Sequence, residues 1–435
     1  MPDLNLTASQ LLFWSGQKLH NRSPIYNIVS AVTIFEPIEI EGLRRAFQTL
    51  VNSSDALRGA IDESSSTPRM RVVPSAPYRI EYFDFSHQLD RHARLDSWIR
   101  ERSRRAFDLN DRLYDSALIK FSDREYVYYL NHHQLIGDGW ASVLMLRHLF
   151  EFYELSLKGE LPDVVALPQF ADYVGFERQH RSSPRYAKTL SYWKQKLAER
   201  LAPMTFYGRQ PQRQTVRGNR IGCGLNPARR RKLNQLASQR SLFKGTPDLS
   251  LFILYASIFF RYLQRISGAT TLSLGVMNHN RVSKTFGETI GMLMGVVPLR
   301  VKIEEGESAL SFYHRVSDEV LQSLKYGQHS EGNPVNNRTY YATLNYIASA
   351  VPEFRGRPIN VDWVHPGAQT EVIGLNIRQS SSQGEVVLEF DFDSDFFTAE
   401  QQLQAIEDFC TTFDEFLDEL GRAIASPGVG SLVSQ

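Results

Sequence analysis

Residues 131–142 read Asn-His-His-Gln-Leu-Ile-Gly-Asp-Gly-Trp-Ala-Ser, and this stretch says most about the fold and the chemistry. It follows an apolar run at 126–130 whose valine, leucine and tyrosine side chains favour a buried strand. A Gly-Asp-Gly turn at 137–139 leads into an apolar run of helical character. The two histidines therefore lie where a strand meets a turn, which is a common position for a group that transfers protons.

The composition is that of a large globular chain with little net charge. The sequence has 435 residues, of which 42% are hydrophobic, and its formal net charge is +1. This length exceeds one ordinary core and predicts two packed domains. The charge gives no reason to expect a nucleic-acid or membrane partner. The two cysteines, Cys223 and Cys410, cannot build a disulfide framework, and with an N-terminus that lacks a secretory signal they favour a cytoplasmic protein.

Helices and strands alternate along both halves, which predicts α/β sandwiches. Helices are expected at 6–14, 41–51, 143–153, 226–240, 248–266 and 399–423. Strands are expected at 28–35, 126–130 and 271–277, with a hairpin formed by 371–377 and 386–392. The apolar run at 249–260 is shorter than the ~20 residues of a membrane span and reads as a buried helix. We place the boundary between an N-terminal lobe, 1–178, and a C-terminal lobe, 179–435.

The central stretch resembles the His-His-x-x-x-Asp-Gly signature of the condensation domains of non-ribosomal peptide synthetases and their acyltransferase relatives. If Asp138 and Gly139 take the last two positions, His133 takes the place of the first histidine and Gln134 that of the second. His132 then precedes the motif. In the family, the second histidine is the one credited with catalysis. Further segments resemble family elements in the family's order, at 7–14, 55–58, 107–109, 169–173, 280–281, 290–300 and 391–397.

The resemblance implies a fold of two chloramphenicol-acetyltransferase-like lobes in a V, with a tunnel at the seam and the motif midway along it. It implies a free-standing acyltransferase of specialised-metabolite biosynthesis, such as antibiotic assembly. The enzyme would transfer an acyl or aminoacyl group from a carrier-protein thioester to an amine acceptor. The phosphopantetheine would belong to the acyl or peptidyl carrier protein, and no cofactor of the chain's own is implied. No cysteine and histidine spacing suggests a zinc site.

The resemblance also implies roles for single residues. Asp138 would be mainly structural, paired with a buried arginine, for which Arg281 is the favoured candidate and Arg58 the second. Gly139 would permit a close approach of the backbone, and its N–H would help to bind the thioester oxyanion. The expected catalytic set is His133, Gln134, Asp138 and Gly139, and the expected structural or tunnel residues are His132, Trp140, Arg281 and Arg58.

Gln134 raises the question of how the reaction would be catalysed. An amide orients a nucleophile by hydrogen bonding but does not accept a proton at neutral pH. An amine that is already neutral needs little deprotonation, whereas an alcohol needs a base, so glutamine favours amide formation over ester formation. If the strand persists through His132 and His133, they point to opposite faces and one of them faces the seam. A one-residue bulge that carries His133 into the catalytic position is the alternative.

Two other functions stay open. One is an ester-forming acyltransferase of the same superfamily, and the other is a catalytically degenerate protein that only docks carriers. An open seam favours the enzymes, and a seam plugged by large side chains favours the docking protein. The basic run at 229–232 is either a solvated helix face or a docking surface for an acidic carrier.

Overall fold

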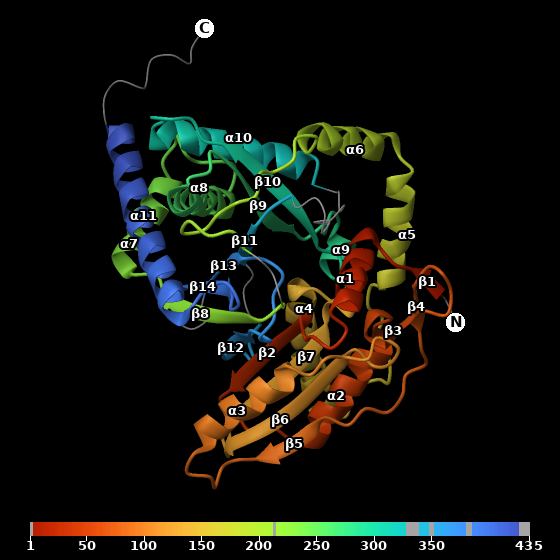
Figure 1. The fold of residues 1–435 in the computed structure, drawn as a ribbon. Helices are drawn as coiled ribbons and strands as arrows, with labels where there is room; N and C mark the ends of the chain where they lie inside the picture. Colours follow the sequence, from red (N-terminus) through yellow and green to blue (C-terminus); the bar gives the residue numbers. More distant parts are fainter. Residues whose placement is uncertain (1–2, 212–214, 328–338, 348–351, 380–384, 426–435) are drawn as a thin grey trace.

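A computed structural model describes residues 3–211, 215–327, 339–347, 352–379 and 385–425 of the chain. The first part contains β1 (Asp3–Asn5), α1 (Ala8–Leu19), β2 (Asn27–Ile34), α2 (Ile40–Ser53), β3 (Gly59–Asp62), β4 (Arg69–Val72), β5 (Glu81–Asp84), α3 (Arg91–Ser103), β6 (Tyr114–Ser122), β7 (Glu125–His133), α4 (Gly139–Lys158), α5 (Phe170–Arg181) and α6 (Pro184–Lys196). The second part contains β8 (Gly218–Gly224), α7 (Pro227–Ala237), α8 (Pro247–Ser267), β9 (Thr271–Asn278), α9 (Lys284–Gly287), β10 (Gly295–Lys302), α10 (Ala309–Lys325), β11 (Ala342–Ile347), β12 (Asn360–Val364), β13 (Ile373–Gln379), β14 (Val386–Asp393) and α11 (Ala399–Ala425). Figure 1 shows two lobes, one above the other, with α6 beside α10 in the upper lobe and β12 beside β2 in the lower one.

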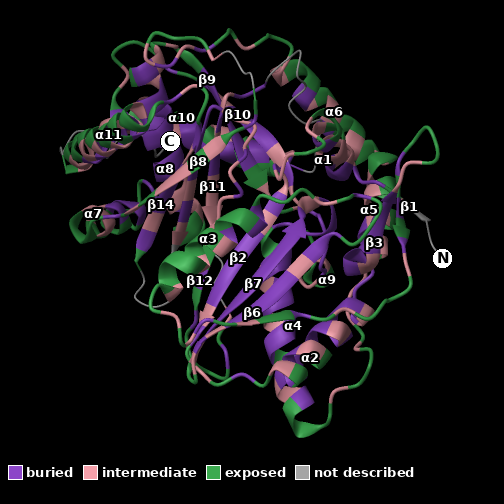
Figure 2. Cartoon of the chain, turned by 60° about the horizontal axis from the view of Figure 1, so that its bottom comes forward, coloured by how far each residue is buried: buried purple, intermediate pink, exposed green. Residues whose placement is uncertain are grey.

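The N-terminal lobe is a sheet with helices on both faces. Within the described residues its strand order is β12-β2-β7-β6-β5, and β7 is the central strand. Helices α2 and α4 pack together and share one apolar core with the sheet. Helix α3 covers the opposite face, where Trp98 packs edge-on against Tyr129 at 5.1 Å between ring centroids. Because both faces are covered, β7 is buried almost throughout, as its apolar run predicts (Figure 2).

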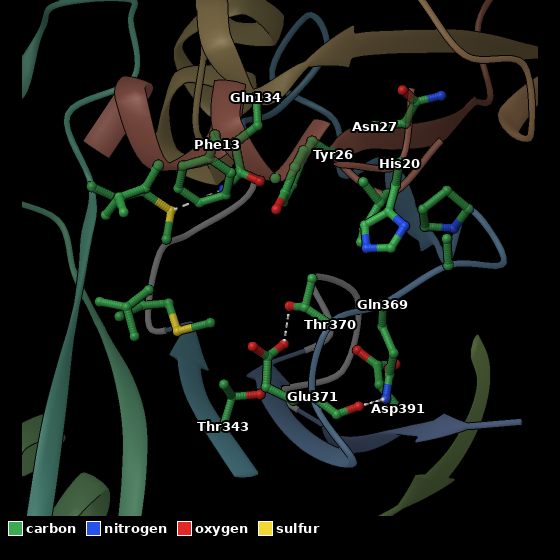
Figure 3. Close-up of a pocket in the computed structure, with 18 of the residues that line it drawn as sticks. Phe13, His20, Tyr26, Asn27, Gln134, Thr343, Gln369, Thr370, Glu371 and Asp391 are labelled. Carbon is green, nitrogen blue, oxygen red and sulfur yellow. Dashed lines mark hydrogen bonds between the residues drawn. The ribbon is translucent and has the colours of Figure 1, made fainter. Parts of the chain in front are cut away.

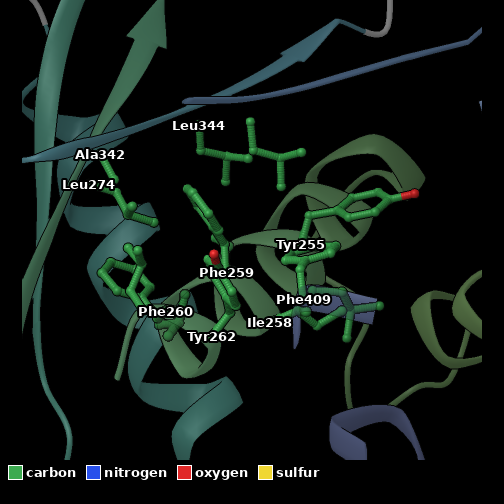
Figure 4. Close-up of a cluster of buried hydrophobic side chains, with 14 of the residues drawn as sticks. Tyr255, Ile258, Phe259, Phe260, Tyr262, Leu274, Ala342, Leu344 and Phe409 are labelled. Carbon is green, nitrogen blue, oxygen red and sulfur yellow. The ribbon is translucent and has the colours of Figure 1, made fainter. Parts of the chain in front are cut away.

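The C-terminal lobe is a sheet with the order β10-β9-β11-β13-β14-β8 among the described strands. Its largest core packs α8, α10 and α11 against one face of this sheet, with Phe259, Tyr262 and Phe409 in contact near its centre (Figure 4). Helix α8 starts at a Thr246 cap with proline in its first turn and ends at Gly268, whose φ of 68° favours glycine. By length and composition α8 could cross a membrane, but 67% of its apolar window is buried in this core.

The predicted helices and strands are largely confirmed. The 6–14 helix is α1, and its Thr7 cap is a capping box with Gln10. The 248–266 helix is α8 and is buried, while the helix expected through residue 240 ends at Ala237. The hairpin strands are β13 and β14, which pair antiparallel. Their connection, residues 380–384, lies outside the described residues.

One strand crosses between the lobes. β12 pairs antiparallel with β2 and so adds an edge strand to the N-terminal sheet. Phe354, Ile359 and Val361, on and before β12, join the core of that lobe. A single boundary in the sequence therefore does not separate the two sheets, because the C-terminal half supplies one strand to the other lobe. This crossing ties the lobes together beside the seam.

Candidate functional site

A cavity of about 480 Å³ lies at the seam between the lobes. The N-terminal wall is formed by α1, the segment before β2, and the residue after β7. The C-terminal wall is formed by β9, β10, β11, β13, β14 and the segment at 365–371. Side chains that define the two walls include Phe13, Tyr26, Gln134, Met277, Met294, Val296, Thr343, His365, Glu371, Asn376 and Asp391 (Figure 3). The described residues thus leave an open cavity at the seam.

Strand alternation explains why β11, β13 and β14 contribute polar side chains to the C-terminal wall. In β14, Leu388, Phe390 and Phe392 belong to the core, and Glu389 and Asp391 alternate with them. Successive side chains of a strand point to opposite faces of the sheet, so the residues between the core residues face the seam. In the same way Thr343 alternates with the core residues of β11 and Asn376 with those of β13. One sheet thus supplies a dry core on one face and a hydrogen-bonding wall on the other.

Gln134 is the residue of the His/Asp-Gly motif that lines the cavity. Strand β7 ends at His133, and a single 3-10 turn (Gln134–Ile136) begins at Gln134, whose backbone N–H donates to the Tyr26 carbonyl at 2.8 Å. The side-chain Nε2 lies 3.4 Å from Met294 Sδ, a weak contact. Its Oε1 accepts no hydrogen bond from the part of the chain that the structure describes. The cavity wall therefore presents a free amide oxygen, an acceptor for an N–H or O–H group.

His133 is buried beneath this wall. Its Nδ1 accepts a hydrogen bond from the Leu135 N–H at 3.1 Å, and its Nε2 lies 3.1 Å from Gln17 Oε1. The Gln17 amide is oriented by donating through its own Nε2 to the carbonyls of His20 and Ser23. Since Gln17 Oε1 can only accept, His133 is the neutral tautomer with its proton on Nε2. Both ring nitrogens are thus used inside the lobe.

The bulge hypothesis for His133 is wrong. The β2–β7 register is unbroken to the pair of Asn27 and His133, and the irregularity of β6–β7 lies at Lys120 and Ser122. His133 is 1% exposed and is not among the described residues that line the cavity. Its ring instead packs edge-on against Tyr26, with 6.2 Å between centroids, and so supports a side chain that does line the cavity.

His132 is also buried, on the side of α4. Its Nε2 lies 2.7 Å from Ser142 Oγ, and its Nδ1 lies 3.4 Å from the His133 carbonyl oxygen. The expectation that one of the two histidines faces the seam is therefore not met. Burial lowers the pKa of His132 to about 4 and that of His133 to about 3. Both rings are neutral at physiological pH.

These histidines predict a pH-dependent stability. In the unfolded chain they bind protons near pH 6.5, whereas in the folded protein they stay neutral down to about pH 4. The unfolded state thus binds more protons in this window, so the stabilisation is complete above pH 6.5 and is lost as the pH falls toward 4. Each imidazole is expected to contribute on the order of 3 kcal/mol to the loss. Urea denaturation at about pH 7.5, 6 and 5 measures it.

Two variants test the assignment of this pH dependence. His133→Asn is expected to flatten the dependence of unfolding free energy on pH, whereas His87→Asn, at an exposed position, leaves it unchanged. An unaltered slope in His133→Asn would rule out this histidine as its source.

Asp138 joins the motif to the segment before β10. Its Oδ1 accepts from the Ala141 N–H at 2.8 Å, which caps α4, and from Arg281 Nη2 at 2.8 Å. Its Oδ2 accepts from the N–H groups of Leu293 and Met294, both at 3.1 Å. The side chains of Asp138 and Arg281 are 2% and 3% exposed. Arg281, the favoured candidate, is thus the arginine that pairs with Asp138. The pair connects α4 to the segment before β10 but does not line the cavity.

The other predicted residues lie elsewhere. Arg58 does not reach Asp138, because its Nε donates to the Ser54 carbonyl and its Nη1 lies 3.5 Å from the Val73 carbonyl oxygen. Trp140 is 39% exposed and donates through Nε1 to the Gly287 carbonyl at 2.8 Å, so it links α4 to α9. Gly139 is exposed at the first turn of α4, and a Cβ there would meet no heavy atom within 4 Å. The space beside the Gly139 backbone is open.

Most of the cavity wall was not predicted from the sequence. Tyr26 follows a short loop and packs edge-on against Phe13 at 4.8 Å between centroids. Gly16 allows this position, since a Cβ there would lie 2.0 Å from the Tyr26 hydroxyl oxygen. Glu371 belongs to no motif, and the element at 391–397 gave no role to Asp391. The alternation of acidic and aromatic residues in 389–393 was the signal that could have located the polar face of β14.

The basic run at 229–232 is used within the C-terminal lobe. Arg229 pairs with Asp414 through two contacts of 2.8 and 2.6 Å, and Lys232 pairs with Asp418. These pairs fasten α7 to α11, so this run gives no specific support to a carrier-docking surface. Among the described residues no group of three histidine, cysteine or acidic side chains is placed to hold a metal ion.

Comparison with known proteins gives a consistent picture. Residues 3–331 match the family model described as the Condensation domain. The chain is 26% identical over 325 residues to a component of the linear gramicidin synthase of Brevibacillus parabrevis, covering 73% of this chain and 6% of that protein. It is 23% identical over 414 residues to a component of the plipastatin synthase of Bacillus subtilis, covering 91% of this chain and 16% of that protein. The chain thus spans a small part of these relatives.

Solved structures show the same fold. The starter condensation domain of rhizomide synthetase RzmA, in complex with C8-CoA, superposes with a TM-score of 0.84 at 20% identity, covering 96% of this chain and 95% of that one. The first condensation domain of the calcium-dependent antibiotic synthetase, in complex with a substrate analogue, gives a TM-score of 0.82 at 19% identity, covering 96% and 97%. The predicted fold of two chloramphenicol-acetyltransferase-like lobes is confirmed.

Proposed function

The chain belongs to the condensation-domain family, and from this membership we propose that it transfers an acyl or aminoacyl group from a carrier-protein thioester to an amine. The thioester is carried on the phosphopantetheine arm of the partner, which reaches the seam cavity. The amine nitrogen attacks the thioester carbon, and the C–N bond forms as the C–S bond breaks. The nitrogen loses one proton and the departing sulfur gains one, so the carrier leaves as a free thiol. One observation carries the proposal: an open cavity at the seam is lined by the amide of Gln134 at the motif position.

Gln134 acts by positioning in this proposal. Its free Oε1 accepts an N–H of the attacking amine and holds the nitrogen lone pair toward the thioester. Holding two reactants together contributes effective molarities of about 10⁵–10⁸ M, whereas general-base assistance contributes about 10²–10⁴-fold. Positioning alone therefore supports acylation of an amine that is already neutral. Asp138 and Arg281 act through the backbone, because Asp138 caps α4 and holds the N–H groups of Leu293 and Met294, the segment whose Met294 contacts Gln134.

We expect a strong preference for amines over alcohols. Purified protein is mixed with an acyl-loaded carrier and with an amine or alcohol of the same carbon skeleton, and intact-mass spectrometry follows loss of the acyl group. Wild type is expected to form the amide at least roughly 10²-fold faster than the ester, because an alcohol lacks its base. Gln134→Ala is expected to slow amide formation roughly tenfold, the loss of one hydrogen bond. Gln134→His is expected to raise ester formation more than amide formation, since the imidazole supplies a base.

The alternatives give different results in the same assay. Equal rates with amine and alcohol in wild type would favour an ester-forming acyltransferase. Binding of the loaded carrier without transfer to any acceptor would favour the catalytically degenerate docking protein. His133→Asn serves as the control for a neighbouring motif position, and its transfer rate is expected to stay close to wild type once the loss of stability is taken into account.

A further inference from the structure

The charge of the cavity lining is unbalanced. Among the described residues that line the cavity there are two carboxylates, Glu371 and Asp391, and neither a lysine nor an arginine. The histidine on the same wall, His365, is neutral at physiological pH because burial lowers its pKa to about 4. The cavity therefore attracts cations only if the negative charge of these carboxylates is not balanced by positively charged side chains outside the cavity.

Asp391 is neutralised by the residues behind it. Arg220 donates to it twice, through Nε to Oδ1 at 2.6 Å and through Nη2 to Oδ2 at 2.8 Å, and Asn376 Nδ2 donates to Oδ2 at 2.8 Å. Glu389, the next acidic residue on this face of β14, is shared by Arg220 and Arg378. Two arginines thus balance two carboxylates, and this network presents no net charge to the cavity.

Glu371 has no such compensation. The Thr370 hydroxyl donates to its Oε2 at 2.5 Å, while its Oε1 has no partner and neither oxygen has a cationic neighbour in the described part of the chain. The side chain is half-buried and, as Figure 3 shows, lies across the cavity from Gln134. An anion in such a partly dehydrated wall attracts a cation more strongly than it would in bulk water. The walls thus offer an amide oxygen on one side and an uncompensated carboxylate on the other.

We propose that Glu371 binds a positively charged group of the acceptor, so that the acceptor is an amine with a second, cationic nitrogen, such as a diamine or a basic amino acid. This inference rests on the proposed function for the identity of the reaction. The attacking nitrogen must be neutral, and an ion pair with Glu371 would keep it protonated. The nitrogen that Glu371 holds is therefore a different one, and the acceptor spans the cavity from Gln134 to Glu371. Glu371 is a specificity-determining residue in this arrangement.

Binding tests this inference without any chemistry. The probes are 1,5-diaminopentane and 1-hexanol, which match in length, the diamine being cationic and the alcohol uncharged at the pH used. Titration calorimetry is run at about pH 8, well above the range in which His365, whose pKa burial lowers, gains a proton. Wild type is expected to bind the diamine roughly tenfold more tightly than 1-hexanol, the effect of one charge-assisted hydrogen bond. Glu371→Gln is expected to abolish this preference and leave 1-hexanol binding unchanged.

A control variant and a transfer assay distinguish failure of the Glu371 inference from failure of the proposed function. Glu160→Gln removes the same charge from an exposed position outside the cavity and is expected to retain the preference. A wild type without a preference for the diamine, or a Glu371→Gln variant that keeps it, would overturn the inference. If transfer from a loaded carrier proceeds with hexylamine but not faster with the diamine, the Glu371 inference fails and the proposed function stands. If diamine binding depends on Glu371 but neither amine is acylated, the proposed function fails.

Discussion

Asp138→Ala is expected to lower the free energy of unfolding by about 3–5 kcal/mol, the cost of leaving one charge of a buried pair without its partner. Arg281 would remain 3% exposed, with only the carbonyls of Phe286 and Thr289 as acceptors, both at 2.7 Å. The N–H groups of Leu293 and Met294 would lose their acceptor, and α4 would lose its cap. Urea denaturation of wild type and variant measures the difference.

A double-mutant cycle separates the ion pair from the rest of the site. Asp138→Asn keeps an acceptor for the cap but removes the charge, and Arg281→Met removes the other charge. The double variant is expected to lose less unfolding free energy than the two single variants lose together. The difference, which is the coupling energy of the pair, is expected to be at least about 1 kcal/mol. Asp123→Ala, which removes an exposed carboxylate paired with Lys120, is the control and is expected to leave the stability close to that of wild type. Additive losses in the cycle would show that the pair is not coupled.

Val296→Trp is expected to reduce acyl transfer at least roughly 10²-fold while the protein stays folded. Val296 is a half-buried residue of β10 that lines the cavity opposite α1 and pairs with Met277 on β9. An indole at this position would extend into the cavity and not into the core, so it would exclude the reacting ends of the substrates. The rate of acyl transfer falls because the two substrates can no longer align in the cavity, although no catalytic group has been removed. Val296→Ala, which enlarges the cavity, is the matched control and is expected to retain transfer.

Local sequence patterns predicted the elements well. The Thr7 cap, the apolar run of 126–130 and the long apolar helix all appear where capping chemistry and periodicity place them. These signals extend over one or two turns of the chain. They therefore predict a helix or strand but not the element with which it packs or pairs. That limit explains why β12 was not assigned to the N-terminal sheet: strand pairing with β2 is decided by which edge is uncovered in the folded lobe.

The site was harder to predict for the same reason. Alternation predicted that one of the two histidines would face the seam, but β7 ends at His133 and the turn that begins there brings Gln134 to the cavity. The partners of the histidines, Gln17 and Ser142, come from α1 and α4, and no local pattern pairs either of them with a histidine. The pair of Asp138 and Arg281, separated by 143 residues, was reached through family resemblance and not from local pattern.

The central claim is that acyl transfer to an amine takes place in the cavity between the lobes, with Gln134 holding the nucleophile. A single-turnover experiment with an acyl-loaded carrier and an amine, read by intact-mass spectrometry for wild type, Val296→Ala and Val296→Trp side by side, tests it most directly. The account predicts amide product from the first two proteins and almost none from the third, with all three unfolding at similar urea concentrations. Equal product from a folded Val296→Trp variant, or none from wild type, would contradict it.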